Sequence, residues 1–302
     1  MSAAPTTALS LLGLLLLLSC PISAYLVSPP PLVLQYHHGR VLTGKLTLHL
    51  MWYGDFTSSQ RAIITDFLIS LSPSSPPPPP SVSSWWSTTG LYHSHPTSPP
   101  SITLGPQVIL PSSTLGRTLH SSALPALAAV ALSNNTNPFA LALIITSADV
   151  AVEGFCSSRC GTHSRLPGGA PYLWVGDSLA QCPGQCAWPF HQPPYGPQTP
   201  PLGAPNGDVG ADGVVINLAT LLAGTVTNPD GKGYFQGPED APLEAVTACA
   251  GIFGTGAYPG YPGKVLVDPT TGASYNARGV NGRKYLLPAM WDPKTSQCAS
   301  LV

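Results

Sequence analysis

The sequence predicts a mixed α/β protein with a single sheet and flanking helices, stapled by disulfides. Stretches with the apolar pattern of strands alternate with stretches of helical apolar spacing, and no internal repeat interrupts them. Six cysteines remain once a short apolar leader is set aside. The chain after Cys249 is rich in Gly and Tyr and in turn-forming sequences, which indicates an irregular C-terminal region.

Residues 1–24 form the leader. They carry no charged side chain and contain an apolar run followed by small residues, which is the layout of a secretory signal peptide, although its basic n-region is missing. The simplest cleavage site follows Ala24. A membrane anchor is the alternative, but this apolar run is shorter than the about 20 residues that a span needs. We therefore expect residues 25–302 to form one secreted domain without a membrane span.

The charge balance argues against two classes of partner. The chain has 12 Lys and Arg against 13 Asp and Glu, for a net charge of −1, and this balance gives no electrostatic case for binding nucleic acid or an anionic membrane. Only 8% of the residues are charged, whereas Gly and Pro number 30 and 36. The 43% of apolar residues can supply a core.

The cysteines predict disulfides, because an even number in an exported chain is typical of paired thiols. The favoured pairing joins Cys249 to Cys298 and lets the two C-x3-C pairs bridge each other. A zinc site made by the four cysteines of those pairs is the alternative, which an oxidising compartment disfavours. The six candidates are Cys156, Cys160, Cys182, Cys186, Cys249 and Cys298.

The N-terminal elements follow in order. A proline-rich extended segment over 25–40 precedes an alternating strand over Leu46–Tyr53. Thr57, with Gln60 three residues later, has the pattern of a capping box and predicts a helix start. The helix ends at a polyproline stretch over 72–81, which we interpret as a stiff surface loop, with docking of a proline-reading partner as the alternative.

The middle of the chain adds aromatic and apolar elements. Trp85, Trp86 and Tyr92 are interpreted as core residues, with a sugar-binding platform as the alternative. A short strand is predicted over Val108–Leu110. A helix is predicted over Leu115–Leu132, interrupted or kinked at its internal proline.

Two further strands and one helix complete the layer pattern. Asn134 begins a sequon for N-glycosylation in a loop. Phe139–Thr146 is a continuous apolar run, which predicts a buried central strand, and Tyr172–Val175 predicts another. The apolar stretch over 213–226 predicts a long helix that starts at Asp212-Gly213. A hairpin is predicted from Lys264–Asp268 and Ser274–Arg278.

Long stretches of the chain resemble the plant EXORDIUM-like, phosphate-induced protein family. They include SRCGTH, YLWVG, QCPGQCAWPFHQPPYGPQTPPL, PNGDVGADGVVINLATLLAGTVTNP and GRKYLLPAMWDP, in order, over nearly all of the mature chain. The resemblance implies a plant protein of the apoplast that acts in brassinosteroid-responsive growth, cell expansion, and carbon or phosphate status. It brings no established enzymatic activity, and its extracellular partner, a wall polymer or a receptor, is unknown.

A fainter resemblance is to zinc metallopeptidases of the zincin group, in which a helix presents HExxH to one metal. If residues 227–229 are the turn that ends such a helix, the expected ligands and base fall at Thr220, Leu221 and Gly224. None of these can bind zinc or act as a base, and Glu244 alone matches a downstream acidic ligand. The hypothesis is a degenerate zincin-like scaffold with no catalytic residue, metal or cofactor.

The sequence contains two other candidate sites. His163 and His191 lie near the cysteine clusters, and Asp208 and Asp212 precede the long helix. The favoured interpretation is structural histidines beside disulfides; the alternatives are a His/Asp metal or hydrolase site and a pocket formed by the two histidines with Glu244. Residues 206–213 resemble a fragment of a calcium loop but lack its closing Glu.

Three function classes therefore stay open. The first is a non-catalytic growth-signalling protein, the second a secreted hydrolase of peptides or glycans, and the third a polysaccharide-binding module that uses Trp85, Trp86, Tyr258 and Tyr261.

Overall fold

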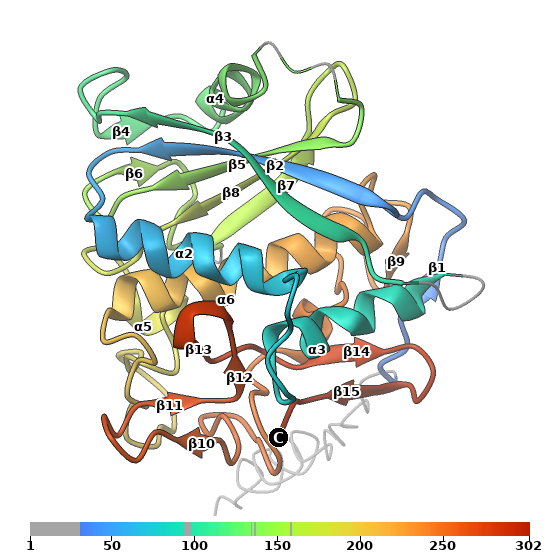
Figure 1. Ribbon diagram of the computed structural model, residues 1–302, viewed down its shortest axis with the longest axis vertical. Helices are drawn as coiled ribbons and strands as arrows, with labels where there is room; N and C mark the ends of the chain where they lie inside the picture. Colours follow the sequence, from blue (N-terminus) through green and yellow to red (C-terminus); the bar gives the residue numbers. More distant parts are fainter. Residues whose placement is uncertain (1–30, 94–97, 134, 136, 158) are drawn as a thin grey trace, which may run out of the picture. The chain divides into compact units, whose positions relative to one another are not determined.

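A five-stranded sheet with strand order β3-β2-β5-β8-β7 is the centre of the fold (Figure 1). Four strands run parallel, and β7 runs antiparallel to β8 at one edge. The strands are β2 (Lys45–Tyr53), β3 (Ser101–Leu110), β5 (Ala140–Thr146), β7 (Gly161–Arg165) and β8 (Pro171–Gly176). The computed structural model describes residues 31–93, 98–133, 135, 137–157 and 159–302, and Leu32–Val302 forms one compact unit.

Helices cover both faces of this sheet (Figure 1). α2 (Ser58–Leu71) and α6 (Val209–Thr227) lie on one face, where Leu143 of β5 and Leu218 of α6 belong to the same buried cluster. α4 (Ala123–Ala131) lies on the other face, where Leu127 shares a second cluster with Ile144 of β5. β5 and β8 are buried at every residue, as expected for strands covered on both faces. The mixed α/β prediction is confirmed.

The start of α2 shows how directly some of this follows from sequence. Thr57 is its N-cap, and the Thr57 side chain accepts a hydrogen bond from the Gln60 backbone N–H at 3.1 Å. The Gln60 side chain accepts in turn from the Thr57 backbone N–H at 3.0 Å. The predicted capping box is therefore present, and it satisfies two N–H groups that a helix start leaves without partners.

Short paired strands and helical turns surround the main sheet. β1 (Gln35–Tyr36) pairs with β9 (Tyr234–Phe235), β4 (Thr118–Leu119) with β6 (Ala151–Val152), β10 (Leu266–Val267) with β11 (Ser274–Tyr275), β12 (Ala277–Arg278) with β13 (Lys284–Tyr285), and β14 (Met290–Asp292) with β15 (Gln297–Ala299). The helical turns are α3 (Val82–Trp86), η1 (Ser87–Tyr92), α5 (Pro183–Cys186), η2 (Thr247–Cys249) and η3 (Val280–Gly282). The predicted hairpin is found in β10 and β11, but Ala277 and Arg278 pair with β13 instead.

Two predicted helix bounds were wrong. The helix predicted over Leu115–Leu132 begins only at Ala123, after β4, so Pro125 is its third residue rather than an internal kink. A proline is tolerated there because the first N–H groups of a helix have no partner within it. α6 begins before Asp212, because Asp208 is its N-cap and accepts from the Ala211 backbone N–H at 2.9 Å.

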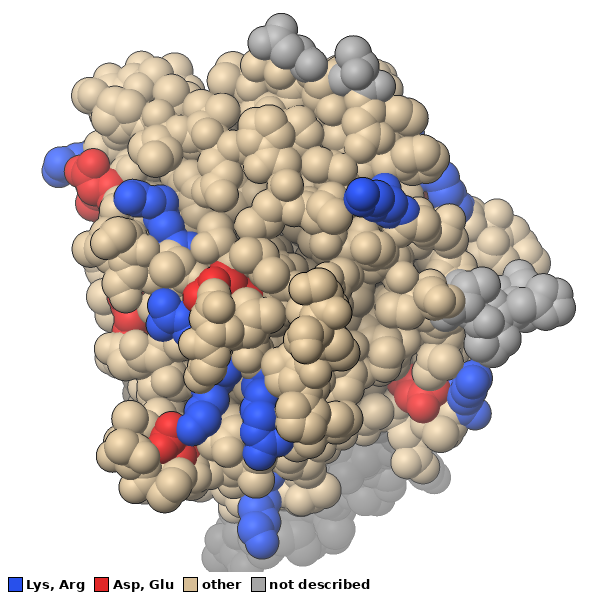
Figure 2. Space-filling view, in the orientation of Figure 1, with Lys and Arg blue, Asp and Glu red and all other residues tan. Residues whose placement is uncertain are grey.

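α6 is unusual in being apolar around most of its circumference. By length and composition it is the one helix among the described residues that could cross a membrane. However, 78% of its most apolar 18-residue stretch is buried inside the protein. Its packing against β7, β8, α2 and α5 accounts for this composition. Charged side chains are scattered over the surface that Figure 2 shows, and the rest of that face is uncharged.

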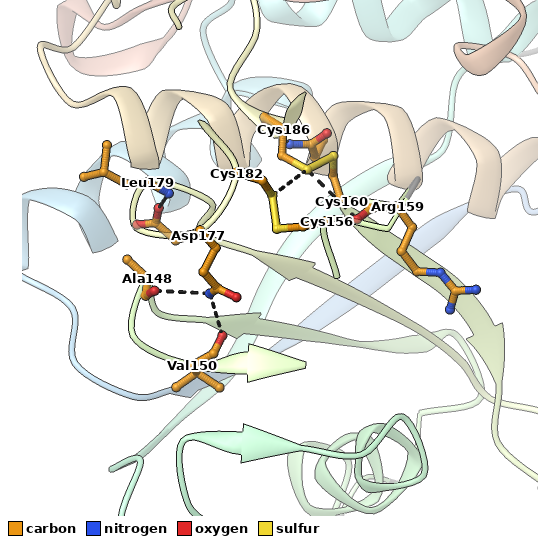
Figure 3. Close-up of a disulfide and its surroundings, with 11 residues drawn as sticks. Ala148, Val150, Cys156, Arg159, Cys160, Asp177, Leu179, Cys182 and Cys186 are labelled. Atoms are coloured by element: carbon orange, nitrogen blue, oxygen red, sulfur yellow. Dashed lines mark hydrogen bonds between the residues drawn. A yellow bond between two sulfur atoms is a disulfide. The ribbon is translucent and has the colours of Figure 1, made fainter. Parts of the chain in front are cut away.

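Three disulfides staple the fold, as the sequence predicts. Cys156 pairs with Cys182 and Cys160 with Cys186, so two neighbouring bonds join the segment before β7 to α5 (Figure 3). The Sγ atoms of Cys182 and Cys186 are 3.6 Å apart. The third bond, Cys249–Cys298, joins η2 to β15. The alternative zinc site is wrong, because none of its four cysteines is a free thiolate.

Some predictions fall outside the described residues. They include the signal peptide over 1–24 and, in the sequon, Asn134 and Thr136.

Replacing both Cys249 and Cys298 by Ala should lower the free energy of unfolding by about 4 kcal/mol, because this bond closes a loop with a sequence separation of 49. Replacing Cys156 and Cys182 should cost clearly less, since Cys160–Cys186 still closes a loop of the same separation, 26. Urea unfolding of both variants measures the difference. Equal losses would show that loop closure does not account for the stabilisation.

A second prediction concerns Asp212, which is buried and accepts from the Asn206 backbone N–H at 2.8 Å and side-chain amide at 2.7 Å. Burial raises the Asp212 pKa to about 7, so the folded state favours the protonated acid. Its contribution to stability should be fully present below the unfolded pKa, near 3.8, and be lost as the pH rises through about 7.

Between pH 5 and pH 8 this loss should be on the order of 2 kcal/mol. Unfolding measured across that range for the protein and for Asp212→Asn separates this effect from other titrations, because the variant cannot ionise there. A pH dependence that is the same in both proteins would contradict the assignment.

Candidate functional site

A cleft of about 450 Å³ runs beside the edge strand β7 and is lined by all five residues of that strand. Its other lining residues come from α6 and from the chain that follows α6 toward η2. We call it the β7 cleft. These other residues are Leu221, Asn228, Pro229, Asp230, Gly231, Glu239, Asp240, Pro242 and Glu244.

The central feature of the β7 cleft is a contact between His163 and Glu244. His163 Nε2 lies 2.9 Å from one carboxylate oxygen of Glu244 and 3.1 Å from the other. An ionised carboxylate only accepts hydrogen bonds, so Nε2 is the donor. The two side chains are 16% and 10% exposed, which shields this interaction from solvent far more than an ion pair on the surface.

Asn228 fixes the position of the Glu244 carboxylate. It is the C-cap of α6, and its side-chain amide donates to Glu244 Oε1 at 2.7 Å. Its side-chain oxygen accepts from the Gly233 backbone N–H at 2.7 Å, which sets the orientation of the amide. Because Asn228 is buried and both ends of its amide are engaged, the end of α6 holds Glu244 against His163.

Gly224 makes the room for this contact on the α6 side. A Cβ atom at this position would lie 2.5 Å from Glu244 Oε2 and 3.2 Å from His163 Nε2. A side chain at position 224 therefore requires the Glu244 carboxylate, which Asn228 holds in place, to shift. Gly224 stands at a position where a zincin would have a zinc ligand. In this protein a glycine is needed there so that His163 and Glu244 can make their contact.

The sequence-predicted site residues separate into two groups. His163, Glu244, Leu221 and Gly224 come together at the β7 cleft. Thr220 does not line the cleft, and its hydroxyl donates to the Ile216 carbonyl within α6 at 3.0 Å. His191 is exposed elsewhere, with Nδ1 at 3.0 Å from the carbonyl oxygen of Gln192. The structure therefore brings His163 and Glu244 together at the cleft, but His191 does not line it.

Sequence reasoning missed Asn228, and also the ion pairs at the rim of the cleft. Arg165 contacts Asp230 at 2.9 Å, and Arg40 contacts the same carboxylate at 3.2 Å. Lys232 pairs with Glu239. The Asn-Pro that follows the apolar run predicts where α6 ends, but no local pattern indicates that its amide reaches Glu244, 16 residues later.

The acidic and imidazole side chains that line the cleft are His163, Asp230, Glu239, Asp240 and Glu244. Among the described residues, no group of three or more His, Cys, Asp or Glu side chains is arranged to hold a metal ion. Near the His163–Glu244 contact the α6 side contributes Leu221 and Gly224, which have no acid, base or nucleophile. What the arrangement offers is one fixed imidazole, one fixed carboxylate and the exposed edge of a strand.

The proposed aromatic platform is not present as a unit. Trp85 and Trp86 are buried, and their indole N–H groups donate to the carbonyls of Pro288 and Pro100, both at 2.7 Å. Tyr258 is 60% exposed, and its ring centre lies 5.0 Å from that of Tyr261. The alternative with four aromatics is wrong for the tryptophans, and only the tyrosine pair remains.

Comparison with known proteins gives extensive matches. A family profile described as the phosphate-induced protein 1 conserved region matches residues 34–301. EXORDIUM-like 2 of Arabidopsis thaliana is 55% identical, with 93% of each chain covered. PHOSPHATE-INDUCED 1 of Nicotiana tabacum is 53% identical, with 93% of this chain and 92% of the relative covered. EXORDIUM of Arabidopsis thaliana is 53% identical, with 89% and 90% covered. No solved structure matches.

The close approach at Gly224 leads to a prediction that runs against helix propensity. Gly→Ala inside a helix normally stabilises by about 0.5–1 kcal/mol, but Gly224→Ala should destabilise by about 1–3 kcal/mol because its Cβ collides with the Glu244 carboxylate. Thermal or urea unfolding measures the change.

A double-mutant cycle isolates the cause. In a Glu244→Ala background the collision is absent, so adding Gly224→Ala should then be neutral or stabilising. If Gly224→Ala costs the same with and without Glu244, the helix does not pack against this carboxylate.

Proposed function

Since the chain belongs to the phosphate-induced protein 1 family, we propose that it is a secreted plant protein of the apoplast that promotes growth by binding an extracellular partner. The growth role includes brassinosteroid-dependent cell expansion and the response to carbon or phosphate status. The partner is a wall polymer or a receptor at the cell surface, and the protein acts without catalysing a reaction. The membership rests on the profile match and on relatives more than 50% identical over most of the chain.

The observation that carries the non-catalytic role is the closed His163–Glu244 contact over Gly224. The only imidazole and the most buried carboxylate of the cleft are hydrogen-bonded to each other. The helix offers an apolar side chain and a glycine beneath them. Such a site is pre-organised and shaped, as a recognition site needs to be, and among the described residues no hydroxyl or thiol is hydrogen-bonded to the His163 imidazole as a nucleophile would be.

Secretion is supported by the disulfides. Three bonds, all with ordinary Cα–Cα distances between 5.4 and 5.8 Å, fit a chain that folds in an oxidising compartment. The apolar, uncharged residues 1–24 supply the matching export signal.

A second candidate function is a secreted hydrolase related to the zincins. The observation in its favour is the antiparallel edge strand β7, which packs against the long helix α6 beside a cleft. This candidate requires a metal, for which the cleft supplies one histidine and one buried glutamate.

Expression of the full chain with a C-terminal fluorescent tag in a plant tests the proposal. We expect the tag in apoplastic wash fluid, no free thiol in the purified protein, and larger leaves or roots than in plants that express a chain without residues 1–24. A tagged protein that stays in the cytosol, or a secreted one with no effect on growth, would contradict the proposal.

Metal analysis of the purified protein separates the two candidates. The recognition role predicts far less than one zinc per chain after dialysis against zinc and then buffer. Stoichiometric zinc that is lost in His163→Ala would favour the hydrolase instead.

A further inference from the structure

β7 is an edge strand of the central sheet and pairs with β8 on one side only. Hydrogen bonds just beyond its two ends show which of its backbone groups point toward β8 and which point away from it. The Gly176 N–H donates to the Cys160 carbonyl at 3.3 Å, and the Leu166 N–H donates to the Ala170 carbonyl at 2.9 Å. In an antiparallel pair, hydrogen-bonded and non-bonded residue pairs alternate. The even-numbered residues of β7 therefore bond to β8.

It follows that Gly161, His163 and Arg165 direct their backbone N–H and C=O groups away from β8. The register agrees, because Arg165 lies opposite Pro171, which has no N–H to donate. Among the described residues, no backbone group accepts from the N–H groups of these three residues. The His163 carbonyl receives only a long bond, 3.3 Å, from the Thr162 hydroxyl.

This edge opens onto the β7 cleft. Every residue of β7 lines the cleft, and each of them is at least partly exposed. Proteins commonly protect a sheet edge with a covering element, a proline or a bulge, because unpaired N–H and C=O groups attract another strand. Between Gly161 and Arg165, β7 contains no proline and no break in its register with β8, and its one charged residue is Arg165. A shaped space lies beside it.

We propose that the β7 cleft binds an extended peptide segment, which joins the central sheet as a sixth strand beside β7. The outward groups of Gly161, His163 and Arg165 recur at every second residue, over about 13 Å, which is the spacing that a peptide backbone matches and a sugar ring does not. The bound segment pairs with these groups and passes over Leu221 and the His163–Glu244 contact.

The rim of the cleft indicates the character of the segment. Asp230 and Glu239 are already paired with basic side chains of this chain. Asp240 is exposed and has no ion pair within the described residues. We expect bound segments to carry a Lys or Arg near Asp240 and an apolar side chain near Leu221. The inference rests on the proposed function of the cleft as a recognition site.

Two substitutions at one residue test the backbone pairing. Linear heptapeptides are selected from a phage-displayed library on the purified, disulfide-bonded protein, and the best are synthesised. Arg165→Pro removes an outward N–H, whereas Arg165→Ala removes the same side chain and keeps that N–H. Because this N–H does not bond to β8, a proline is tolerated here as on other edge strands. The proline variant should bind at least tenfold more weakly than the alanine variant.

Hydrogen exchange of the bound protein gives an independent readout. On binding, the amides of Gly161, His163 and Arg165 should become protected, while those of Thr162 and Ser164, already bonded to β8, should change little. This alternation is a signature of strand addition that general stabilisation does not produce. It needs no variant, so it tests the proposal even if Arg165→Pro fails to fold.

The proposal is overturned if the library yields no peptide that binds in this cleft, if the two Arg165 variants bind equally, or if protection does not alternate. Retention of the protein by wall polysaccharide, with no peptide selected, would favour a sugar ligand instead. Peptide binding without any effect on growth would count against the proposed function alone. If the Arg165→Pro and Arg165→Ala variants promote growth equally, the proposed growth function is supported and the proposed peptide binding beside β7 is contradicted.

Discussion

The contact between His163 and Glu244 over Gly224 is the interaction on which the site depends. It joins the edge strand to the chain that leads to η2, and the end of α6 holds it in place through Gly224 and Asn228. Because both partners are largely removed from solvent, losing either one would leave an uncompensated polar group. The contact therefore fixes the shape of the β7 cleft.

The disulfides and the buried helix explain how such a cleft is kept rigid in a protein with few charges. The two bonds made by the four cysteines near β7 tie the start of that strand to α5, and α5 packs on α6. α6 in turn is buried along most of its length. Side chains on elements restrained in this way lose little entropy when a ligand binds, which favours recognition by a preformed surface.

How much could be predicted from the sequence depended on whether the cause was local. The capping box at Thr57 and Gln60 and the buried strand around Ile144 follow from patterns a few residues long, and the structure contains both. β7 was missed because GTHSR has neither alternation nor apolar residues, and it is a strand only because β8 lies beside it. Asn228 and Glu244 meet through the path of the chain after α6, which no spacing rule describes. The sequence singles out position 224 as an expected zinc-ligand position, whereas in the structure Gly224 leaves room for the His163–Glu244 contact.

The most direct test of this account is a crystal structure of the protein grown with excess zinc, with diffraction data collected on both sides of the zinc absorption edge. The account predicts His163 Nε2 within hydrogen-bonding distance of the Glu244 carboxylate, Gly224 packed beneath them, and no anomalous peak in the cleft. An anomalous peak bound to His163, with the Glu244 carboxylate turned toward the metal, would contradict it.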